Sequence, residues 1–331
     1  LVVDDHQKIR KNHAHVQELK PVVYQIPGRK ELLSEKREQM AVIGAGPAGL
    51  FAAYLLAQRG YCPHIYERGR AVEERQQDVE DFWNGGALDP ESNVQFGEGG
   101  AGTFSDGKLN TLVKDKFGRS RYVLETFVKF GAPEDILYVA KPHVGTDVLR
   151  DVISRMRQEI IRLGGTFHFS TKVTDLHIED GRISKIELNH KEWKDVSGVI
   201  LAIGHSARDT FEMLYERKVP MMAKSFAVGM RVEHPQDMIN ESQYGRNADM
   251  TLLPTAAYKV THQSSNGRGV YSFCMCPGGY VVNASSEEGR LAVNGMSYRS
   301  RDSKNANSAI IISVTPEDFP KPDHPLSGVV F

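Results

Sequence analysis

A glycine-rich turn between an apolar strand and an apolar helix is the feature that most constrains the fold of this chain. Residues 40–43 are apolar, the turn reads G-A-G-P-A-G over 44–49, and an apolar helical segment continues to Gly60. A second short strand pattern follows and ends at the acid Glu67. G-x-G-x-x-G alone is a weak signal. Inside a strand–helix–strand unit, with an acid about 20 residues further on, it predicts a dinucleotide-binding site.

Each small residue of this turn has a physical task. Gly44 permits the tight turn out of the strand, Gly46 lets a pyrophosphate approach the backbone, and Gly49 lets the helix pack closely on the strand. Pro47 and Ala48 open the helix, whose first N–H groups and positive dipole end favour phosphate. We therefore place these five residues in the predicted cofactor site. An ordinary glycine turn in an α/β protein is the alternative.

Glu67 narrows the choice of nucleotide. A carboxylate at the end of the second strand accepts hydrogen bonds from both hydroxyls of a ribose and repels a 2′-phosphate. The sequence therefore favours FAD or NAD over NADP, and Glu67 and the adjoining Arg68 are predicted to contact the cofactor.

A second glycine-rich stretch covers residues 96–109 and reads F-G-E-G-G-A-G-T-F-S-D-G-K-L. So many glycines cost conformational entropy unless the backbone has to come close to another group. Successive N–H groups of such a loop form an anion-binding concavity or lie against a flat ring. A flexible solvent loop is the alternative. The cofactor contacts predicted here are Gly99, Gly100, Ala101, Gly102, Thr103, Ser105, Asp106, Gly107 and Lys108.

Composition narrows the function classes. The chain has 331 residues, with 41 basic and 42 acidic side chains, so no nucleic-acid partner is expected. Three cysteines cannot form a disulfide framework, and the apolar runs are too short to span a bilayer. We therefore expect a cytoplasmic protein without a membrane partner. No H-E-x-x-H or paired C-x-x-C motif occurs, so no metal site is predicted.

The pattern of apolar residues predicts an α/β fold in three parts. These are an N-terminal extension over residues 1–39, a Rossmann-type cofactor-binding domain over 40–216 and a β-rich substrate domain over 217–331. Helical signal is sparse in the third part. The strands expected in it cover residues 226–232, 270–276, 280–284 and 310–314.

Further elements are expected in the first two parts. The extension is predicted to contain a short strand at 22–26 and a polar helix at 31–39. The cofactor domain is predicted to contain a surface helix at 71–84, a helix beginning at Thr146, a strand at 166–176, a hairpin turn at 180–181 and a buried strand at 199–205.

Four segments of the chain resemble one group of flavoproteins. Residues 42–50, 96–109, 224–231 and 271–279 resemble the poorly characterised bacterial FAD-dependent dehydrogenases, also labelled NAD(FAD)-utilising dehydrogenases. These belong to the glutathione-reductase-like superfamily of flavoproteins with two dinucleotide-binding domains. The resemblance covers nearly everything from about residue 22 onward. It implies FAD at the first motif, a backbone contact of Val173 to adenine, and a strand that returns to the cofactor through Ala202 and Gly204.

The chain departs from that superfamily towards its end. Members carry a final glycine- and acid-containing motif that holds the ribityl chain of FAD, and no such motif precedes Phe331. We therefore expect the C-terminal part of the cofactor domain to be missing and the β-rich domain to be incomplete. The chain also has no second strand–G-x-G-x-x-G–helix unit. NAD(P)H is therefore expected only as a transient electron donor, bound in another way.

The catalytic residues are less well defined. Cys274 and Cys276 would share one face of a strand with Cα atoms about 6.5 Å apart, near the upper limit for a disulfide. A redox pair that exchanges electrons with flavin is one interpretation, and two small core residues are the other. Lys108 is a candidate for placing positive charge near the flavin, and His205 for donating a proton. For Lys108 the alternatives are a phosphate contact or a surface charge, and for His205 the alternative is a polar cap on the end of a strand.

The motifs and the resemblance together predict an FAD-dependent oxidoreductase of the dehydrogenase type. It would transfer hydride through flavin to or from a small-molecule substrate. Two alternatives remain open: an FAD-fold binding or regulatory protein without redox turnover, and a flavoenzyme that acts on RNA bases. The oligomeric state is also left open.

Overall fold

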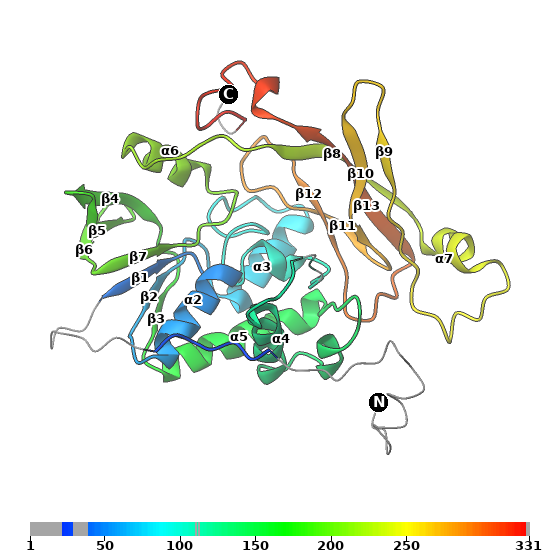
Figure 1. Ribbon diagram of the computed structural model, residues 1–331, viewed down its shortest axis with the longest axis horizontal. Coiled ribbons are helices and arrows are strands. Elements are labelled where there is room, and N and C mark those ends of the chain that lie inside the picture. The colour runs from blue at the N-terminus through cyan, green and yellow to red at the C-terminus, as the bar shows by residue number, and fades with distance from the viewer. Residues whose placement is uncertain (1–21, 29–38, 110, 112, 329–331) are drawn as a thin grey trace.

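The computed structural model describes residues 22–28, 39–109, 111 and 113–328. A parallel sheet with its helices forms one side of the molecule, and an antiparallel sheet forms the other (Figure 1). The fold is therefore α/β, with a Rossmann-type parallel sheet and additional antiparallel sheets, as the sequence predicts.

The parallel sheet holds the glycine turn. Its strand order is β3-β2-β1-β7, and all three pairings are parallel. The strands are β1 (Met40–Ile43), β2 (His64–Tyr66), β3 (Thr166–His168) and β7 (Gly198–Leu201). Ala41, Val42 and Ile43 are all buried because β1 is an inner strand covered on both faces. Helix α2 (Pro47–Gln58) connects β1 to β2, which places the turn at the carboxyl end of β1.

Helices cover one face of this sheet. α2 packs against α5 (Thr146–Arg162), and α4 (Arg119–Lys129) contributes Phe127 to the same core. The predicted helix beginning at Thr146 is confirmed by α5. Its apolar residues recur at helical spacing and are buried: Leu149, Val152, Ile153, Met156 and Ile160.

A small antiparallel sheet covers the other face. It consists of β4 (Val173–Glu179), β5 (Arg182–Leu188) and β6 (Glu192–Asp195) in that order. Asp180 and Gly181 join β4 to β5 with φ values of 50° and 72°, which suits the predicted tight hairpin turn. Helix α6 (Arg208–Glu216) packs beside β4.

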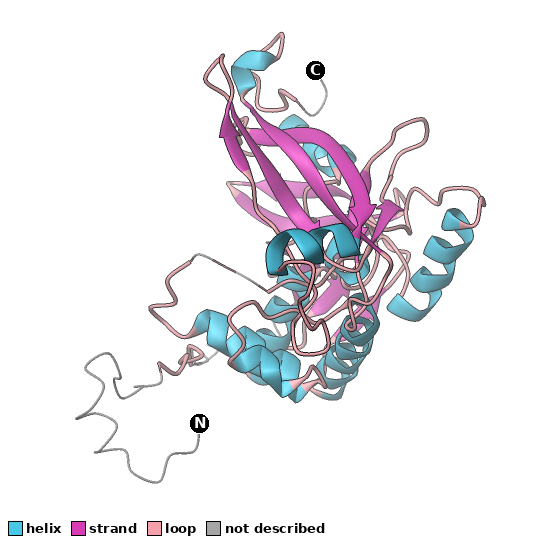
Figure 2. Cartoon of the chain, turned by 90° about the vertical axis from the view of Figure 1, so that its right-hand side faces the viewer, coloured by secondary structure: helices cyan, strands magenta, loops and turns pink. Residues whose placement is uncertain are grey.

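The β-rich part begins after α6. Its main sheet has the order β8-β13-β10-β9, and all pairings are antiparallel. Figure 2 shows the strands of the molecule in magenta. The strands of the main sheet are β8 (Phe226–Pro235), β9 (Thr261–Gln263), β10 (Gly269–Cys276) and β13 (Asn305–Val314), and a hairpin of β11 (Tyr280–Asn283) and β12 (Val293–Met296) lies alongside. The remaining elements are α3 (Val72–Trp83), α7 (Gln236–Tyr244) and the short 3-10 turns η1 (Ala101–Phe104), η2 (Glu134–Leu137) and η3 (Pro316–Asp318).

Several local predictions are wrong. Residues 22–28 have no regular secondary structure, and the Tyr24 ring instead packs on Tyr122 at 5.4 Å between centroids. The expected strand at 166–176 is two strands, because β3 pairs with β2 whereas β4 pairs with β5 in another sheet. The strand expected at 199–205 ends at Leu201, which is 43% exposed because β7 lies at the sheet edge.

Two other expectations concern helices. The prediction of sparse helical signal after residue 216 overlooks α7. The polar helix expected at 31–39 falls almost wholly on residues 31–38, which lie outside the described residues. Among the helices that the structure describes, none combines the length and the apolar character needed to cross a membrane.

Candidate functional site

The glycine turn is built so that side chains are excluded. Gly44 has φ of 98°, and an added Cβ would clash with the Ala202 carbonyl of the neighbouring strand. A Cβ on Gly49 would likewise clash with the Gly44 carbonyl, so this glycine lets α2 lie against the turn. Gly46 precedes α2, and no side chain caps the first turn of that helix. The helix N-terminus therefore keeps N–H groups for an outside acceptor.

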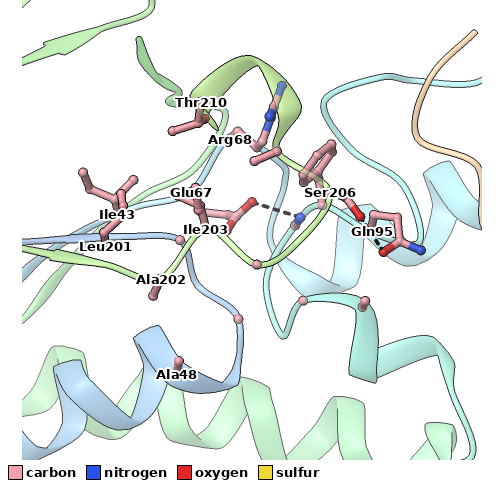
Figure 3. A pocket seen from close by; sticks show the side chains of 18 of the residues that line it. Ile43, Ala48, Glu67, Arg68, Gln95, Leu201, Ala202, Ile203, Ser206 and Thr210 are labelled. Atoms are coloured by element: carbon pink, nitrogen blue, oxygen red, sulfur yellow. Dashed lines mark hydrogen bonds between the residues drawn. The ribbon is translucent and has the colours of Figure 1, made fainter. Parts of the chain in front are cut away.

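A cavity of about 500 Å³ lies beside this turn. Figure 3 shows its walls, with Ala48 on α2 below and Glu67, Leu201 and Ile203 from the strand ends around it. Of the predicted cofactor contacts, those that line the cavity are Gly44, Gly46, Pro47, Ala48, Glu67, Arg68, Gly100, Ala101, Gly102, Val173, Ala202 and Gly204. The catalytic candidate His205 is exposed and also lines it.

The first half of the glycine loop closes one side of the cavity. The Gly99 N–H donates to the Ala45 carbonyl at 2.9 Å, which ties the loop to the first glycine turn. Gly100 has φ of 63°, and a Cβ there would lie 3.0 Å from the Gly46 Cα. The two glycine segments therefore meet backbone to backbone, and the expectation of a flexible solvent loop does not describe residues 97–102.

The second half of the loop turns away from the cavity. Asp106 is buried and forms ion pairs with Arg301 and with Lys108, whose Nζ lies 3.6 Å from it. Arg301 belongs to the β-rich part of the chain. Further predicted contacts also lie outside the cavity lining, namely Gly49, Gly99, Thr103, Ser105 and Gly107. A direct contact of any of these residues with a cofactor stays a prediction.

Glu67 is buried beneath both glycine segments. Its carboxylate accepts backbone N–H bonds from Ala45 at 2.7 Å, Gly69 at 2.9 Å and Gly97 at 2.9 Å. A carboxylate offers about four acceptor positions, so one position remains for a ribose hydroxyl. Glu67 therefore also holds the two glycine segments together, a role that the motif alone does not indicate.

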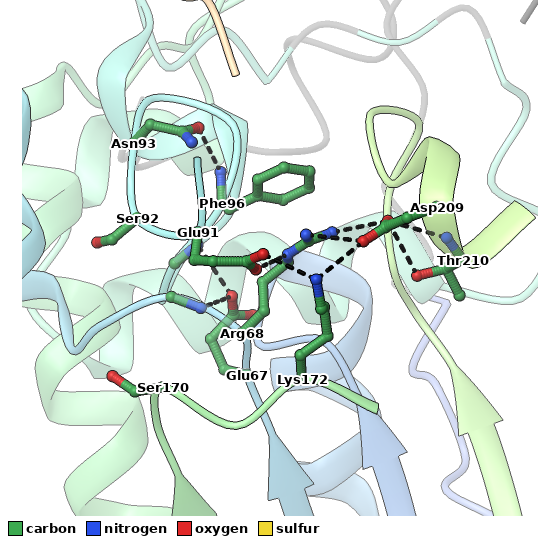
Figure 4. Close-up of polar contacts among 12 residues, drawn as sticks. Glu67, Arg68, Glu91, Ser92, Asn93, Phe96, Ser170, Lys172, Asp209 and Thr210 are labelled. Carbon is green, nitrogen blue, oxygen red and sulfur yellow. Dashed lines mark hydrogen bonds and ion pairs between the residues drawn. The ribbon is translucent and has the colours of Figure 1, made fainter. Parts of the chain in front are cut away.

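A charged cluster adjoins the cavity next to Glu67, and two of its members, Arg68 and Lys172, line the cavity (Figure 4). Arg68 donates to Glu91 at 2.6 Å and, through both terminal nitrogens, to Asp209 at 2.9 and 3.0 Å. Lys172 reaches the same two acids at 2.8 and 3.2 Å. Although burial opposes the charge of each group, these hydrogen bonds raise the pKa of Arg68 and lower the pKa values of Glu91 and Asp209.

Arg68 of this cluster also lies over an aromatic ring. The Arg68 guanidinium lies 4.1 Å from the centroid of the Phe96 ring, and both residues line the cavity. Stacked planar groups of this kind suit contact with a planar base. Glu91, Lys172 and Asp209 could not be predicted from the sequence because no local spacing relates them, whereas Phe96 begins the predicted glycine-rich stretch but was not among its expected contacts.

Arg75 also supports the site, although no sequence motif indicates it. The predicted surface helix at 71–84 is α3, but its Arg75 side chain is fully buried. It donates to carbonyls of Asn93 at 2.8 Å, Glu98 at 2.6 Å and Gly100 at 3.0 Å. Burial lowers the pKa of Arg75 to about 10, so it stays a cation near neutral pH. It therefore fixes the backbone of the glycine loop from behind.

The cysteine pair lies apart from the cavity, on β10. Both thiols are free. The expectation of a regular strand at this pair is wrong, because the β10–β13 register shifts between Phe273 and Cys276 and Cys274 has φ of 48°. Within the described ranges, no three His, Cys, Asp or Glu side chains group so as to hold a metal ion.

The geometry fits the diphosphate and ribose of a dinucleotide. Two facing glycine backbones, an uncapped helix N-terminus and a buried acid surround one cavity. Gly46, Pro47 and Ala48 would hold the phosphates, and Glu67 the ribose of adenosine. The Arg68–Phe96 stack would contact the adenine end.

Comparison with known proteins agrees with this fold. Residues 225–331 match a family model described as "FAD-dependent protein, C-terminal domain-like". Residues 42–75 match one described as "NAD(P)-binding Rossmann-like domain". The two matches identify a Rossmann-type dinucleotide-binding region joined to a domain found in FAD-dependent proteins.

Relatives were found by sequence and by structure. An uncharacterized protein of Clostridium beijerinckii is 52% identical over 310 residues, which are 93% of this chain and 57% of that protein. The chain thus spans little more than half of that relative. The thiamine thiazole synthase of Thermotoga maritima is 24% identical over 60% of this chain and 66% of its own length. The crystal structure of THI4 from Thermovibrio ammonificans is 16% identical, with a TM-score of 0.35 over 56% of this chain and 66% of that chain.

Proposed function

We propose that this chain is the dinucleotide-binding part of an FAD-dependent oxidoreductase that acts on a small-molecule substrate. The observation that carries the proposal is the meeting of two glycine backbones around an uncapped helix N-terminus, with Glu67 buried beneath them. The match of residues 225–331 to a domain of FAD-dependent proteins supports FAD over NAD at this site. NAD(P)H is proposed as a transient electron donor.

The residues of the site have separate tasks in this proposal. A flavin, when bound, supplies the acceptance and donation of hydride. The first turn of α2 binds the diphosphate, Glu67 accepts from the ribose, and Arg68 with Phe96 contacts the adenine. Ser206 donates to Gln95 at 3.1 Å, and both residues line the cavity (Figure 3).

Gly46→Ala tests the site directly. Gly46 has φ of −71°, which alanine adopts without strain, and a Cβ would meet only the Gly100 Cα at an ordinary 3.7 Å. The fold should therefore survive while the methyl group obstructs the phosphates. We expect FAD affinity to fall about ten-fold or more, measured by quenching of flavin fluorescence during titration. Competition by ADP should weaken in parallel.

Gly269→Ala is the matched control. This glycine lies on β10 outside the cavity lining, and an added Cβ meets no atom within 4 Å. Its FAD affinity should equal that of the unaltered chain. Equal affinity in Gly46→Ala would contradict the placement of the diphosphate. Anaerobic bleaching of the flavin band by NADH or NADPH then separates an oxidoreductase from a binding protein without turnover, which would bind FAD but not bleach.

A further inference from the structure

The end of β10 brings two thiols together at a bulge. Cys274 has φ of 48°, a conformation that side-chain-bearing residues adopt at an energetic cost. The Cys276 thiol donates to the Cys274 carbonyl at 3.3 Å. Cys276 has no exposed surface, whereas Cys274 is partly exposed. Cys274 is therefore the more exposed residue of the pair, and Cys276 is fully enclosed.

Hydrogen-bond donors surround the pair. Arg231 on β8 donates through Nη1 to the Cys274 carbonyl at 3.1 Å and to Asn307 Oδ1 at 2.5 Å. A Cβ on Gly295 would collide with Arg231, with Asn307 and with the Cys276 sulfur. These three side chains therefore pack against Gly295. A residue with a side chain at position 295 would force them apart.

Two of these donors lack an acceptor. Asn307 has no exposed surface, and its Nδ2 has no hydrogen-bond partner among the described residues. Arg231 Nε is likewise buried and without a partner in that part of the chain. Buried donors without acceptors are rare in folded proteins, and a negatively charged group beside the thiols would satisfy them.

The electrostatics agree with this geometry. The Cys276 side chain as hydrogen-bond partner, and then the positive charges of Lys108 and Arg231, lower the pKa of Cys274, although burial opposes this shift. The same hydrogen bond and burial raise the pKa of Cys276, with the nearby Asp106 adding to the effect. One thiol is therefore disposed to ionise, and the other is disposed to keep its proton.

We propose that Cys274 and Cys276 form a dithiol that reduces a low-molecular-weight disulfide, with Cys274 as the attacking thiolate and Cys276 as the resolving thiol. The partial exposure of Cys274 and the enclosure of Cys276 assign the two roles. Arg231 donates to the Cys274 carbonyl and so brings its positive charge beside this thiol. This proposal does not depend on the proposed flavin site.

The exchange balances in two steps. Cys274 thiolate attacks one sulfur of R–S–S–R, so that a mixed disulfide forms and one RS⁻ leaves. Cys276 then loses its proton and attacks the Cys274 sulfur, which closes the Cys274–Cys276 disulfide. The second RS⁻ leaves and takes that proton as RSH. Two electrons pass from the pair to the substrate, and an added dithiol reductant returns the pair to its starting state.

Alkylation of the full, reduced chain by iodoacetamide tests the thiolate. Cys62 is the internal control, because it is a free and partly exposed thiol. Tryptic cleavage after Arg268 and Arg290 leaves both members of the pair in one peptide, and fragment ions assign the label. Below neutral pH we expect Cys274 to react about ten-fold faster than Cys62. An equal or slower rate for Cys274 would overturn the proposal.

Hydroxyethyl disulfide tests the exchange itself. In the unaltered chain we expect an internal Cys274–Cys276 disulfide, detected as the loss of two hydrogens from their shared peptide. In Cys276→Ser we expect a stable hydroxyethylthio adduct on Cys274, and in Cys274→Ser no adduct on Cys276. Cys62→Ser should behave as the unaltered chain does. If Cys276→Ser fails to fold by circular dichroism, the mass of the unaltered peptide decides. A lasting adduct or no change there would refute the proposal.

Discussion

Glu98 is a carboxyl group that the fold encloses completely. Its Oε2 accepts from the Val72 N–H at 2.8 Å and faces Arg157 Nη1 at 3.1 Å, whereas Oε1 has no partner among the described residues. Burial raises the pKa of Glu98 to about 7, although the Arg157 charge opposes that shift. The folded chain therefore keeps this proton at pH values where the unfolded chain has already released it.

The stability of the protein should depend on pH through this group. Because the folded-state pKa is the higher one, the contribution of Glu98 to the free energy of unfolding falls as pH rises from about 4.5 to about 7. The whole change is about 3 kcal/mol, since one pKa unit corresponds to about 1.4 kcal/mol. The free energy of unfolding by urea should therefore differ less between about pH 5 and about pH 8 in Glu98→Gln than in the unaltered chain.

The exposed Glu179→Gln provides the control for that experiment. Glu179 lies at the solvent-facing end of β4, so its variant should keep the pH dependence of the unaltered chain. If Glu98→Gln also keeps that dependence, Glu98 is ionised in the folded protein and the shift of its pKa is refuted.

At the level of elements, ion pairs hold α6 beside the cavity at the glycine turn. Asp209 lies in the first turn of α6, where a negative charge also favours the helix dipole. It meets Arg68 in a two-bond contact from the end of β2, and Lys172 from the residue before β4 (Figure 4). Three separate elements are thereby held at one end of the cavity.

A double-mutant cycle measures the coupling free energy between Arg68 and Asp209. We expect Arg68→Met and Asp209→Asn to show a coupling of about 1 kcal/mol in the free energy of unfolding, and less at high salt, because Asp209 is partly exposed. The Lys185–Asp195 pair is the comparison, with its atoms 3.7 Å apart and Asp195 83% exposed. That pair should show no measurable coupling. Equal couplings for the two pairs would contradict the structural role of Arg68.

The elements differ in how well the sequence predicts them. The strand, turn and helix around Gly44 could be predicted because their glycine positions and apolar spacing are local. Helix α7 could not be predicted in this way, because its buried residues are only Gln236 and Ile239 and do not form an apolar stripe. The charged cluster could not be predicted, since Arg68 and Asp209 are 141 residues apart in sequence and meet only through the fold.

In the whole molecule, the glycine loop joins the two sides of the structure. Its first half lines the cavity, and its second half carries Asp106 into contact with the β-rich part. Trp83 Nε1 and Gln95 Nε2 add hydrogen bonds to the carbonyls of Asn283 and Ala284, at 2.8 and 3.1 Å. The sequence indicated the loop but not this division, because the partners of its second half lie in another part of the chain.

The contact of Asp106 with Arg301 allows the connection between the two sides of the molecule to be tested. It is 1% exposed, and its carboxylate accepts from Arg301 Nε at 3.1 Å and from the Ser297 hydroxyl. Although burial favours the neutral acid, the bond to Arg301 and the charges of Lys108 and Arg301 lower the pKa of Asp106. Its stabilising contribution is therefore present above about pH 4 and is lost as pH falls through the lowered folded-state pKa.

Arg301→Met should leave a buried charge without its main partner. We expect a loss of about 2–3 kcal/mol in the free energy of unfolding by urea, because Lys108 and Ser297 compensate only in part. The double variant Asp106→Asn, Arg301→Met should be more stable than Arg301→Met alone, since no charge is then stranded. Arg290→Met is the control, because Arg290 is 70% exposed and its pair with Glu287 should contribute little. A double variant less stable than Arg301→Met would mean that Asp106 does not depend on Arg301 and that other contacts hold the two sides together.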